Sequence, residues 1–188
     1  MTQAAQSSTP TTAWRLDPVH TNVEFAVKHL MISTIHGRFG DVSGTAVVPS
    51  NDVSRAEIEA RVGVASVDTR ETQRDGFLKS SDFFDVEAYP AITFKSRRIE
   101  TAQGDDNTYR VVGDFTLHGV TKEIVLDVSF GGIATDSYKK RRAGFNATAT
   151  INRKDFGLSW NQLLETGGVA VGEDVKLLID AEFIAQPV

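Results

Sequence analysis

Hydrophobic and polar residues alternate along most of this chain. In segment 57–61, for example, Ile58 and Ala60 lie between charged residues. Because successive side chains of a β-strand point to opposite faces, this period of two predicts strands with one buried and one solvated face. Six segments show the pattern clearly: 22–28, 55–64, 109–118, 123–130, 145–152 and 175–183.

Two less regular segments, 37–48 and 91–99, are also predicted as strands. Strands with one buried face are typical of antiparallel sheets, and the short links at 104–107 and 118–121 are typical of hairpins. Eight such strands predict a mainly β fold, an eight-stranded antiparallel up-and-down barrel. Closing the barrel pairs the strand edges that would otherwise invite aggregation.

One short helix is predicted between strands, over 68–81. Asp68, followed three residues later by Glu71, resembles a capping box at its start. The segment is polar until Phe77 and Leu78. We therefore expect the helix to lie on the barrel as a lid or a plug over one opening.

Composition and charge exclude several classes of protein. The 188 residues include 20 Lys and Arg against 25 Asp and Glu, and the net charge of -5 argues against a nucleic-acid partner. Consecutive apolar residues never exceed three, so stable insertion into a membrane as a helix is not expected. The absence of cysteine excludes thiol nucleophiles, disulfides and cysteine metal sites.

The polar residues 1–13 lack the basic and apolar regions of a signal peptide. We expect them to form a disordered tail in front of a single domain over 14–188. The expected location is the cytoplasm, or the periplasm if a leader precedes this sequence.

The candidate chemistry is sparse. The four histidines show no metal-ligand spacing, and no serine-hydrolase elbow, P-loop or dinucleotide motif is present, so no catalytic residue, metal or cofactor is predicted. His29 shares the parity of Phe25 and Val27 and is expected to point inward, where a polar group needs a partner. It fits either a hydrogen-bonded core histidine or a polar contact inside a ligand cavity.

The basic run 139–142 and the inward alanines each have two interpretations. The run is either a solvated hairpin loop or a contact for lipid head groups. Small inward residues leave room either for a ligand or for bulky neighbours across the barrel. An eight-stranded barrel is just wide enough to be filled by side chains or to hold one small ligand.

An ordered set of short stretches covers nearly the whole chain: 14–21 (WRLDPVHT), Phe25, His29, 37–39 (GRF), 68–75, 78–85 (LKSSDFFD), 89–94 (YPAITF), 113–122 (GDFTLHGVTK), 144–145, 152–157 (NRKDFG) and 171–175 (VGEDV). Together these stretches resemble the YceI-like family of polyisoprenoid-binding proteins. The resemblance implies a lipocalin-like barrel that carries a long isoprenoid or similar lipid in an apolar pore. Members of the family often have His where this chain has Phe77, which implies a more apolar pore mouth here. The implied ligand-binding residues are Phe25, Val27, His29, Phe39, Phe83, Phe84, Phe94 and Phe145.

The resulting hypothesis is non-catalytic binding, storage or transport of a long-chain isoprenoid or related lipid, such as a polyprenyl lipid or an isoprenoid quinone. An alternative is a small enzyme that acts on a lipid or quinone through His29 and a nearby acidic residue. A third possibility is a dimeric scaffold whose barrel is filled solid. A homodimer is compatible with each of the three.

Overall fold

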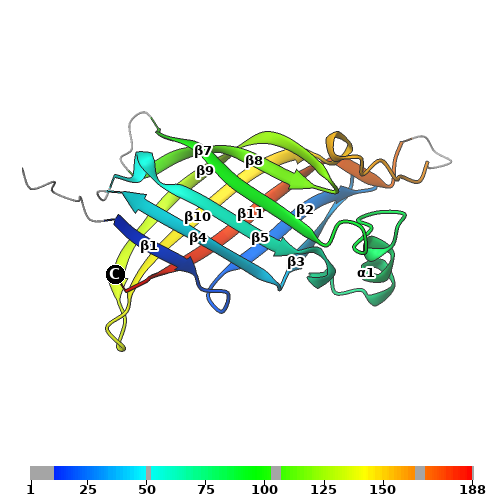
Figure 1. Ribbon diagram of the computed structural model, residues 1–188. Coiled ribbons are helices and arrows are strands. Elements are labelled where there is room, and N and C mark those ends of the chain that lie inside the picture. The colour runs from blue at the N-terminus through cyan, green and yellow to red at the C-terminus, as the bar shows by residue number, and fades with distance from the viewer. Residues whose placement is uncertain (1–10, 50–51, 103–106, 164–167, 188) are drawn as a thin grey trace, which may run out of the picture.

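The computed structural model describes residues 11–49, 52–102, 107–163 and 168–187. Strands dominate these residues, and one α-helix, α1 (Thr72–Lys79), lies at one end of the molecule (Figure 1). The strands are β1 (Thr11–Leu16), β2 (Asn22–His29), β3 (Ser33–Phe39), β4 (Val42–Pro49), β5 (Glu57–Gly63), β6 (Val67–Asp68), β7 (Ala91–Thr101), β8 (Thr108–Leu117), β9 (Val120–Thr135), β10 (Arg141–Asn152) and β11 (Val171–Ala185). Short 3-10 turns lie at Val53–Arg55, Val64–Ser66 and Arg153–Phe156.

The strands form a closed antiparallel barrel. The ring runs β1-β4-β5-β7-β8-β9-β10-β11 and closes because β1 pairs with both β4 and β11. Each of the other three strands continues the line of one strand of this ring, so that the two together form one row of the barrel wall. The strand β2 continues β1 and pairs with β11, and β3 lies in line with β4 and pairs with β2. The strand β6 continues β5 and pairs with β3. In the described part of the chain the barrel therefore has eight rows of strands, as the alternating pattern predicts.

Two details of the prediction are wrong. Residues Thr11 to Ala13, expected in the tail, belong to β1 and pair with Pro49 to Val47 of β4. The single strand predicted over 37–48 is part of two strands, β3 and β4, which are separated at Gly40 and Asp41. Residues 1–10 of the predicted tail lie outside the described residues.

The helix α1 is shorter than predicted and has a different N-cap. The carboxylate of Glu71 accepts hydrogen bonds from the backbone N–H groups of Gln73 and Arg74, so Glu71 caps the helix. Asp68 instead accepts from the backbone N–H of Arg70 and from the Arg38 guanidinium. The helix does lie against one end of the barrel, as expected of a lid (Figure 1).

At the α1 end the wall of the barrel is not formed by paired strands alone. The strand β6 has two residues and, within the described residues, makes no pairing with β7. The chain between these strands forms α1 and the following segment 80–90, which packs back on the helix through a hydrogen bond from Phe84 N to Leu78 O. Helix and loop therefore cover the place where strand pairing stops.

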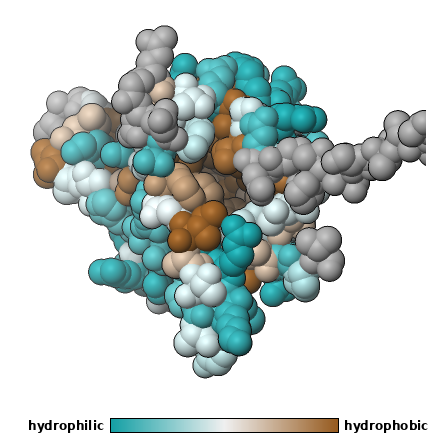
Figure 2. All heavy atoms as spheres, turned by 90° about the vertical axis from the view of Figure 1, so that its left-hand side faces the viewer, coloured by the Kyte–Doolittle hydropathy of each residue, from teal (hydrophilic) through white to brown (hydrophobic). Residues whose placement is uncertain are grey.

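The interior contains two hydrophobic clusters. One includes Trp14, Leu16, Val42 and Phe183 and lies toward the end away from α1. Figure 2 looks onto that end and shows apolar residues at its centre, surrounded by hydrophilic ones. The larger cluster fills the middle of the barrel and extends to α1: Phe39, Val64, Val67, Phe84, Ile92, Phe94, Ile99, Val111, Phe115, Leu117, Ile151, Phe156 and Leu158.

Candidate functional site

A cavity of about 290 Å³ lies at the α1 end of the barrel. This volume is at the lower end of the range for small-molecule sites, about 300 to 1,000 Å³. Strands, the helix, the segment 80–90 and the segments 158–163 and 168–171 all contribute to its wall. The aromatic residues that line it are Phe25, Phe39, Phe77, Phe83, Phe84, Phe115 and Trp160, and the aliphatic ones are Val27, Ile35, Leu78, Ile92, Leu117, Ile151, Leu158, Ala170, Val171, Val175 and Leu177.

Six of the eight residues predicted as pore-lining surround this cavity: Phe25, Val27, His29, Phe39, Phe83 and Phe84. The other two do not line it. Phe94 is buried in the core with its ring over Gly113, where an added Cβ would lie 2.5 Å from the ring. Phe145 packs between Phe130 and Phe183 at the far end, with ring centroids 5.2 and 5.9 Å away. Both therefore help to fill the barrel and are not part of the cavity wall.

The strand β2 places three cavity residues by its alternation. Phe25, Val27 and His29 share one parity and line the cavity, as predicted. The Phe25 ring lies directly on Gly37 of β3, where an added Cβ would be 2.2 Å from a ring carbon. A glycine at position 37 therefore lets the ring lie flat along the wall beside Phe39, whose ring centroid is 5.6 Å away.

Aromatic contacts connect the helix to the other covering segments. The ring of Phe77 lies 4.7 Å from that of Trp160 and 6.0 Å from that of Phe83, between centroids. Phe77 lines the cavity, so the apolar residue noted in the sequence does contribute to the site. Trp160 was not predicted, because it lies in an irregular segment where no periodic pattern indicates a face.

A buried arginine holds this irregular segment in place. Arg153 is 2% exposed and donates hydrogen bonds to the backbone carbonyls of Leu158, Trp160, Val171 and Gly172. Burial lowers the pKa of the guanidinium from its ordinary value. Because Arg153 follows β10 and Gly172 belongs to β11, these bonds fix residues 158–160 against the start of β11 at this end of the barrel.

The polar residues of the cavity are donors for the most part. They are His29, Thr69, Arg74, Arg153 and Gln162, and none of the described lining residues is a carboxylate. Arg74 donates to the hydroxyl and the backbone carbonyl of Thr69. The cavity is thus an apolar chamber with a few hydrogen-bond donors at its wall, which suits an apolar chain with an oxygen-bearing end.

His29 lacks the acidic partner that the enzyme hypothesis requires. Its ring has no hydrogen bond or ion pair among the described residues, and the lining set offers it no Asp or Glu. Catalysis by His29 together with an acidic residue needs the two groups within hydrogen-bond reach of each other. Of the two interpretations of His29 from the sequence, its position fits a polar contact at the wall of a ligand cavity better than a hydrogen-bonded core histidine.

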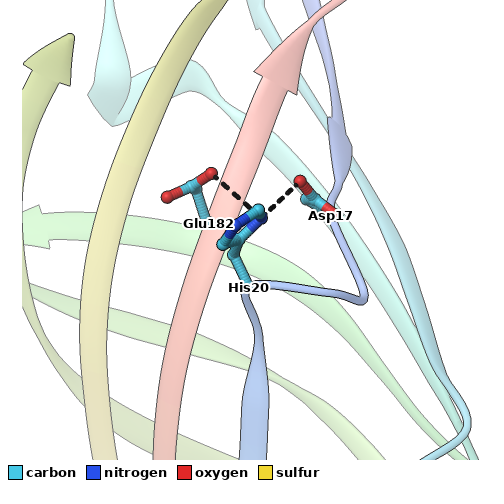
Figure 3. A group of neighbouring side chains, drawn as sticks. All are labelled: Asp17, His20 and Glu182. Carbon is cyan, nitrogen blue, oxygen red and sulfur yellow. Dashed lines mark hydrogen bonds and ion pairs between the residues drawn. The ribbon is translucent and has the colours of Figure 1, made fainter. Parts of the chain in front are cut away.

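A second group of titratable side chains lies outside the barrel wall, near the other end. Asp17, His20 and Glu182 converge with their ligand atoms within 4.8 Å of one another (Figure 3). The Arg142 guanidinium donates to both carboxylates, with 2.7 Å to Asp17, and, with His20, lowers the pKa of Asp17 to about 2. The Arg142 cation already pairs with both carboxylates, so this group is an ion-pair network that joins the β1–β2 turn to β10 and β11.

The basic run 139–142 contributes to this same end. Arg142 belongs to the network, and the guanidinium of Arg141 lies over the Trp14 ring at 5.7 Å. The run is therefore far from the cavity in the fold and is partly neutralised. Among the residues described, no helix has the length and apolar character needed to cross a membrane.

Comparisons with known proteins agree with this architecture. The YceI-like domain matches residues 14–183. The UPF0312 protein SAS2572 of Staphylococcus aureus is 36% identical over 173 residues, covering 92% of this chain and 97% of that protein. A Campylobacter jejuni YCEI protein is 30% identical with a TM-score of 0.70, covering 85% of this chain and 90% of that one.

More distant structures share the fold. BcnA of Burkholderia cenocepacia is 21% identical, with a TM-score of 0.76 over 89% of this chain and 98% of that one. A polyisoprenoid binding domain from Saccharophagus degradans, implicated in plant cell wall breakdown, is 18% identical, with a TM-score of 0.71 over 93% and 99% of the two chains. From the extent of the domain match and the staphylococcal relative, the chain belongs to the YceI-like family.

Proposed function

We propose that the protein binds a long-chain isoprenoid or a related lipid in the cavity at the α1 end, without chemical change, and stores or transports it. The observation that carries the proposal is a chamber lined almost entirely by apolar side chains inside a closed barrel. Transfer of a hydrocarbon chain into such a space contributes about 0.8 kcal/mol for each CH₂ group removed from water. The similarity to the polyisoprenoid binding domain from Saccharophagus degradans supports the choice of lipid.

The polar groups of the cavity support an amphiphilic ligand rather than a plain hydrocarbon. His29, Arg74 and Gln162 line the cavity and carry donors for a quinone, alcohol or phosphate end. A carboxylate at the wall would repel a phosphate, and the described lining residues include none. The small volume indicates that part of a long chain fills the chamber while the rest lies at its mouth, next to Trp160.

The test is to purify the protein without detergent, extract it with solvent and identify the extract by mass spectrometry. We expect about one lipid with an isoprenoid chain per protein chain. Replacing Phe25 with Asp places a carboxylate against the chain and should remove the lipid, because an unpaired charge in an apolar cavity is costly. Tyr138→Asp, at an aromatic residue exposed at the far end, is the matched control and should retain it.

Circular dichroism shows whether Phe25→Asp still folds. Should it unfold, Val27→Phe provides a second variant, which fills the cavity without adding charge. Lipid-free protein from several growth conditions, or full lipid retention by the folded cavity variants, would overturn the proposal.

A further inference from the structure

The mouth of the cavity carries a concentration of exposed apolar side chains. Of the nine large hydrophobic residues that are exposed in the described part of the chain, five lie here: Leu30, Met31, Ile32, Trp160 and Leu163. We call these five residues the mouth rim. Exposed apolar residues scattered singly need no explanation, whereas a group of them indicates an interaction surface.

Backbone hydrogen bonds hold the two parts of the rim together. Leu30 to Ile32 form the tip of the β2–β3 hairpin, and Leu30 N donates to Ala170 O at 2.8 Å. Ala170 N donates in turn to Gln162 O, next to Leu163. The hairpin tip therefore lies beside Ala170 and the segment 158–163 at the end of the barrel that carries α1 (Figure 1).

The residues of the hairpin tip are unfavourable in two ways: their apolar side chains are exposed to water, and two of them have strained backbone angles. Leu30 and Met31 have φ angles of 51° and 59°, in the left-handed region. Tight hairpin turns with two such residues strongly prefer Asn and Gly, because larger side chains are strained there. Yet this turn carries Leu and Met, followed by Ile32, which is 83% exposed. A sequence that departs from local preference twice at one exposed site points to a function for the apolar side chains.

The rim is continuous with the cavity. His29, which lines the cavity, directly precedes Leu30, and Trp160 belongs to both the lining and the rim. Whatever binds to the mouth rim therefore also lies next to the opening through which a ligand enters the cavity. Trp is a residue that favours the boundary between water and hydrocarbon.

The shape and charge of the rim favour a lipid bilayer over a protein partner. A three-residue hairpin tip is small and convex, whereas a stable protein interface buries about 800 Å² on each side. The five rim residues carry no charge, and the chain as a whole has a net charge of -5. Attraction to anionic head groups therefore does not drive docking, and burial of apolar side chains in the interface does.

Resting on the lipid-binding function proposed above, we infer that the protein docks reversibly onto a neutral lipid bilayer through the mouth rim, with the hairpin tip inserted among the head groups. Docking places the cavity mouth at the membrane surface, where an apolar chain passes between bilayer and barrel without crossing water. A short apolar tip without a second anchor gives transient binding, which suits loading and release.

Flotation with phosphatidylcholine vesicles tests docking without reference to the cargo. Ile32→Asn and Val19→Asn form a matched pair, since both side chains are β-branched and 83% exposed, but Val19 lies in the β1–β2 turn, outside the rim. We expect Ile32→Asn to lower the bound fraction about tenfold, as for one aliphatic side chain kept out of the bilayer, and Val19→Asn to leave it unchanged.

A double variant separates docking from folding. Leu30→Asn with Met31→Gly gives the turn the residues that its backbone prefers, so its Tm should equal or exceed that of the wild type while vesicle binding falls more than tenfold. Wild-type protein that does not float, or a double variant that floats like the wild type, would overturn the inference. A concentration-dependent dimer in sedimentation that Ile32→Asn dissociates would assign the rim to a second copy instead.

Solvent extraction of the same preparations separates this inference from the function on which it rests. Lipid in the extract with no vesicle binding refutes docking and leaves the lipid-binding function intact. Rim-dependent vesicle binding by protein whose extract holds no lipid refutes the lipid-binding function and leaves the docking surface.

Discussion

At the end of the barrel away from α1, the rings of Phe130, Phe145 and Phe183 contact one another, with centroids 5.2 and 5.9 Å apart. At the α1 end aromatic rings are more abundant, yet those of Phe25 and Phe84, among others, surround a space of about 290 Å³. The same long strands, β10 and β11 among them, run through both ends (Figure 1).

This difference follows from strand pairing and not from composition. At the far end, β1 pairs on both sides, so the wall is complete and the side chains of facing strands meet. At the α1 end, β6 stops after two residues, and α1, the segment 80–90 and the segments 158–163 and 168–171 complete the wall. These covering segments hold their side chains above the opening rather than deep in the barrel, and a chamber remains beneath them.

The largest expected effect is on stability at the filled end. Phe183→Ala should lower the free energy of unfolding by about 4 kcal/mol, because it leaves a void among packed rings. Phe25→Ala should cost less than half as much, because its ring already borders a space. Denaturant unfolding followed by circular dichroism measures both. Equal losses would contradict the distinction between the two ends.

The ion-pair network should stabilise the filled end in a pH-dependent way. The folded-state pKa of Asp17, about 2, lies below its ordinary value of 3.8, so this carboxylate contributes stability above about pH 4 that is lost as the pH falls toward 2. Asp17→Asn should therefore cost about 2 kcal/mol at pH 7 and flatten the acid limb of the stability profile.

Asp41→Asn is the control for this prediction, since the Asp41 carboxylate is exposed and lies 3.8 Å from Arg61. Surface pairs of this kind contribute about 1 kcal/mol or less. Lipid content should be the same in both variants, because neither residue lines the cavity. An unchanged acid limb in Asp17→Asn would show that the network does not hold this end together.

One substitution made at both ends distinguishes hollow from filled directly. Val111→Phe, at a site 4% exposed toward the far end of β8, should lower stability by about 2 kcal/mol through overpacking. Val27→Phe, at the cavity wall, should leave stability nearly unchanged because the larger ring enters the chamber, and it should reduce lipid content. Thermal unfolding and solvent extraction provide the two readings, and a stability loss at Val27 as large as that at Val111 would indicate a filled barrel.

The smallest effect is expected at the cover. Phe77→Ala removes the ring that lies 4.7 Å from Trp160, and aromatic pairs contribute about 1 kcal/mol. Release of bound lipid to a cyclodextrin acceptor should therefore speed up about fivefold. Tyr138→Ala, at the exposed hairpin of the far end, should release lipid at the wild-type rate. Equal rates in the two variants would show that α1 does not retain the ligand.

The alternation of hydrophobic residues predicts which face of a strand is buried but not how far along the barrel a side chain lies. It places Phe25, Val27 and His29 correctly, because neighbours on one strand share both face and end. Phe94 and Phe145 also point inward, yet they pack below the cavity and at the far end. The position of a side chain along the barrel axis depends on strand register and on the direction of its ring, and alternation determines neither.

The remaining parts of the site depend on contacts between distant segments. Hydrogen bonds from Arg153 to backbone carbonyls set the position of Trp160. Because any residue has a backbone carbonyl, such bonds cannot be recognised from the polarity of the side chains in the sequence. The strand β1 begins with polar residues and is defined by its partners β4 and β11. The network of Asp17, His20 and Glu182 joins residues from the two ends of the chain, and the sequence gives no indication of that proximity.

The proposed function requires that an apolar chain occupy the chamber at the α1 end. A crystal structure of protein purified without detergent tests the occupancy of the chamber most directly. We predict continuous elongated density between Phe25 and Trp160, with the rings of Phe83 and Phe84 above it. A chamber closed by inward movement of those rings, with no density for a ligand, would contradict the account.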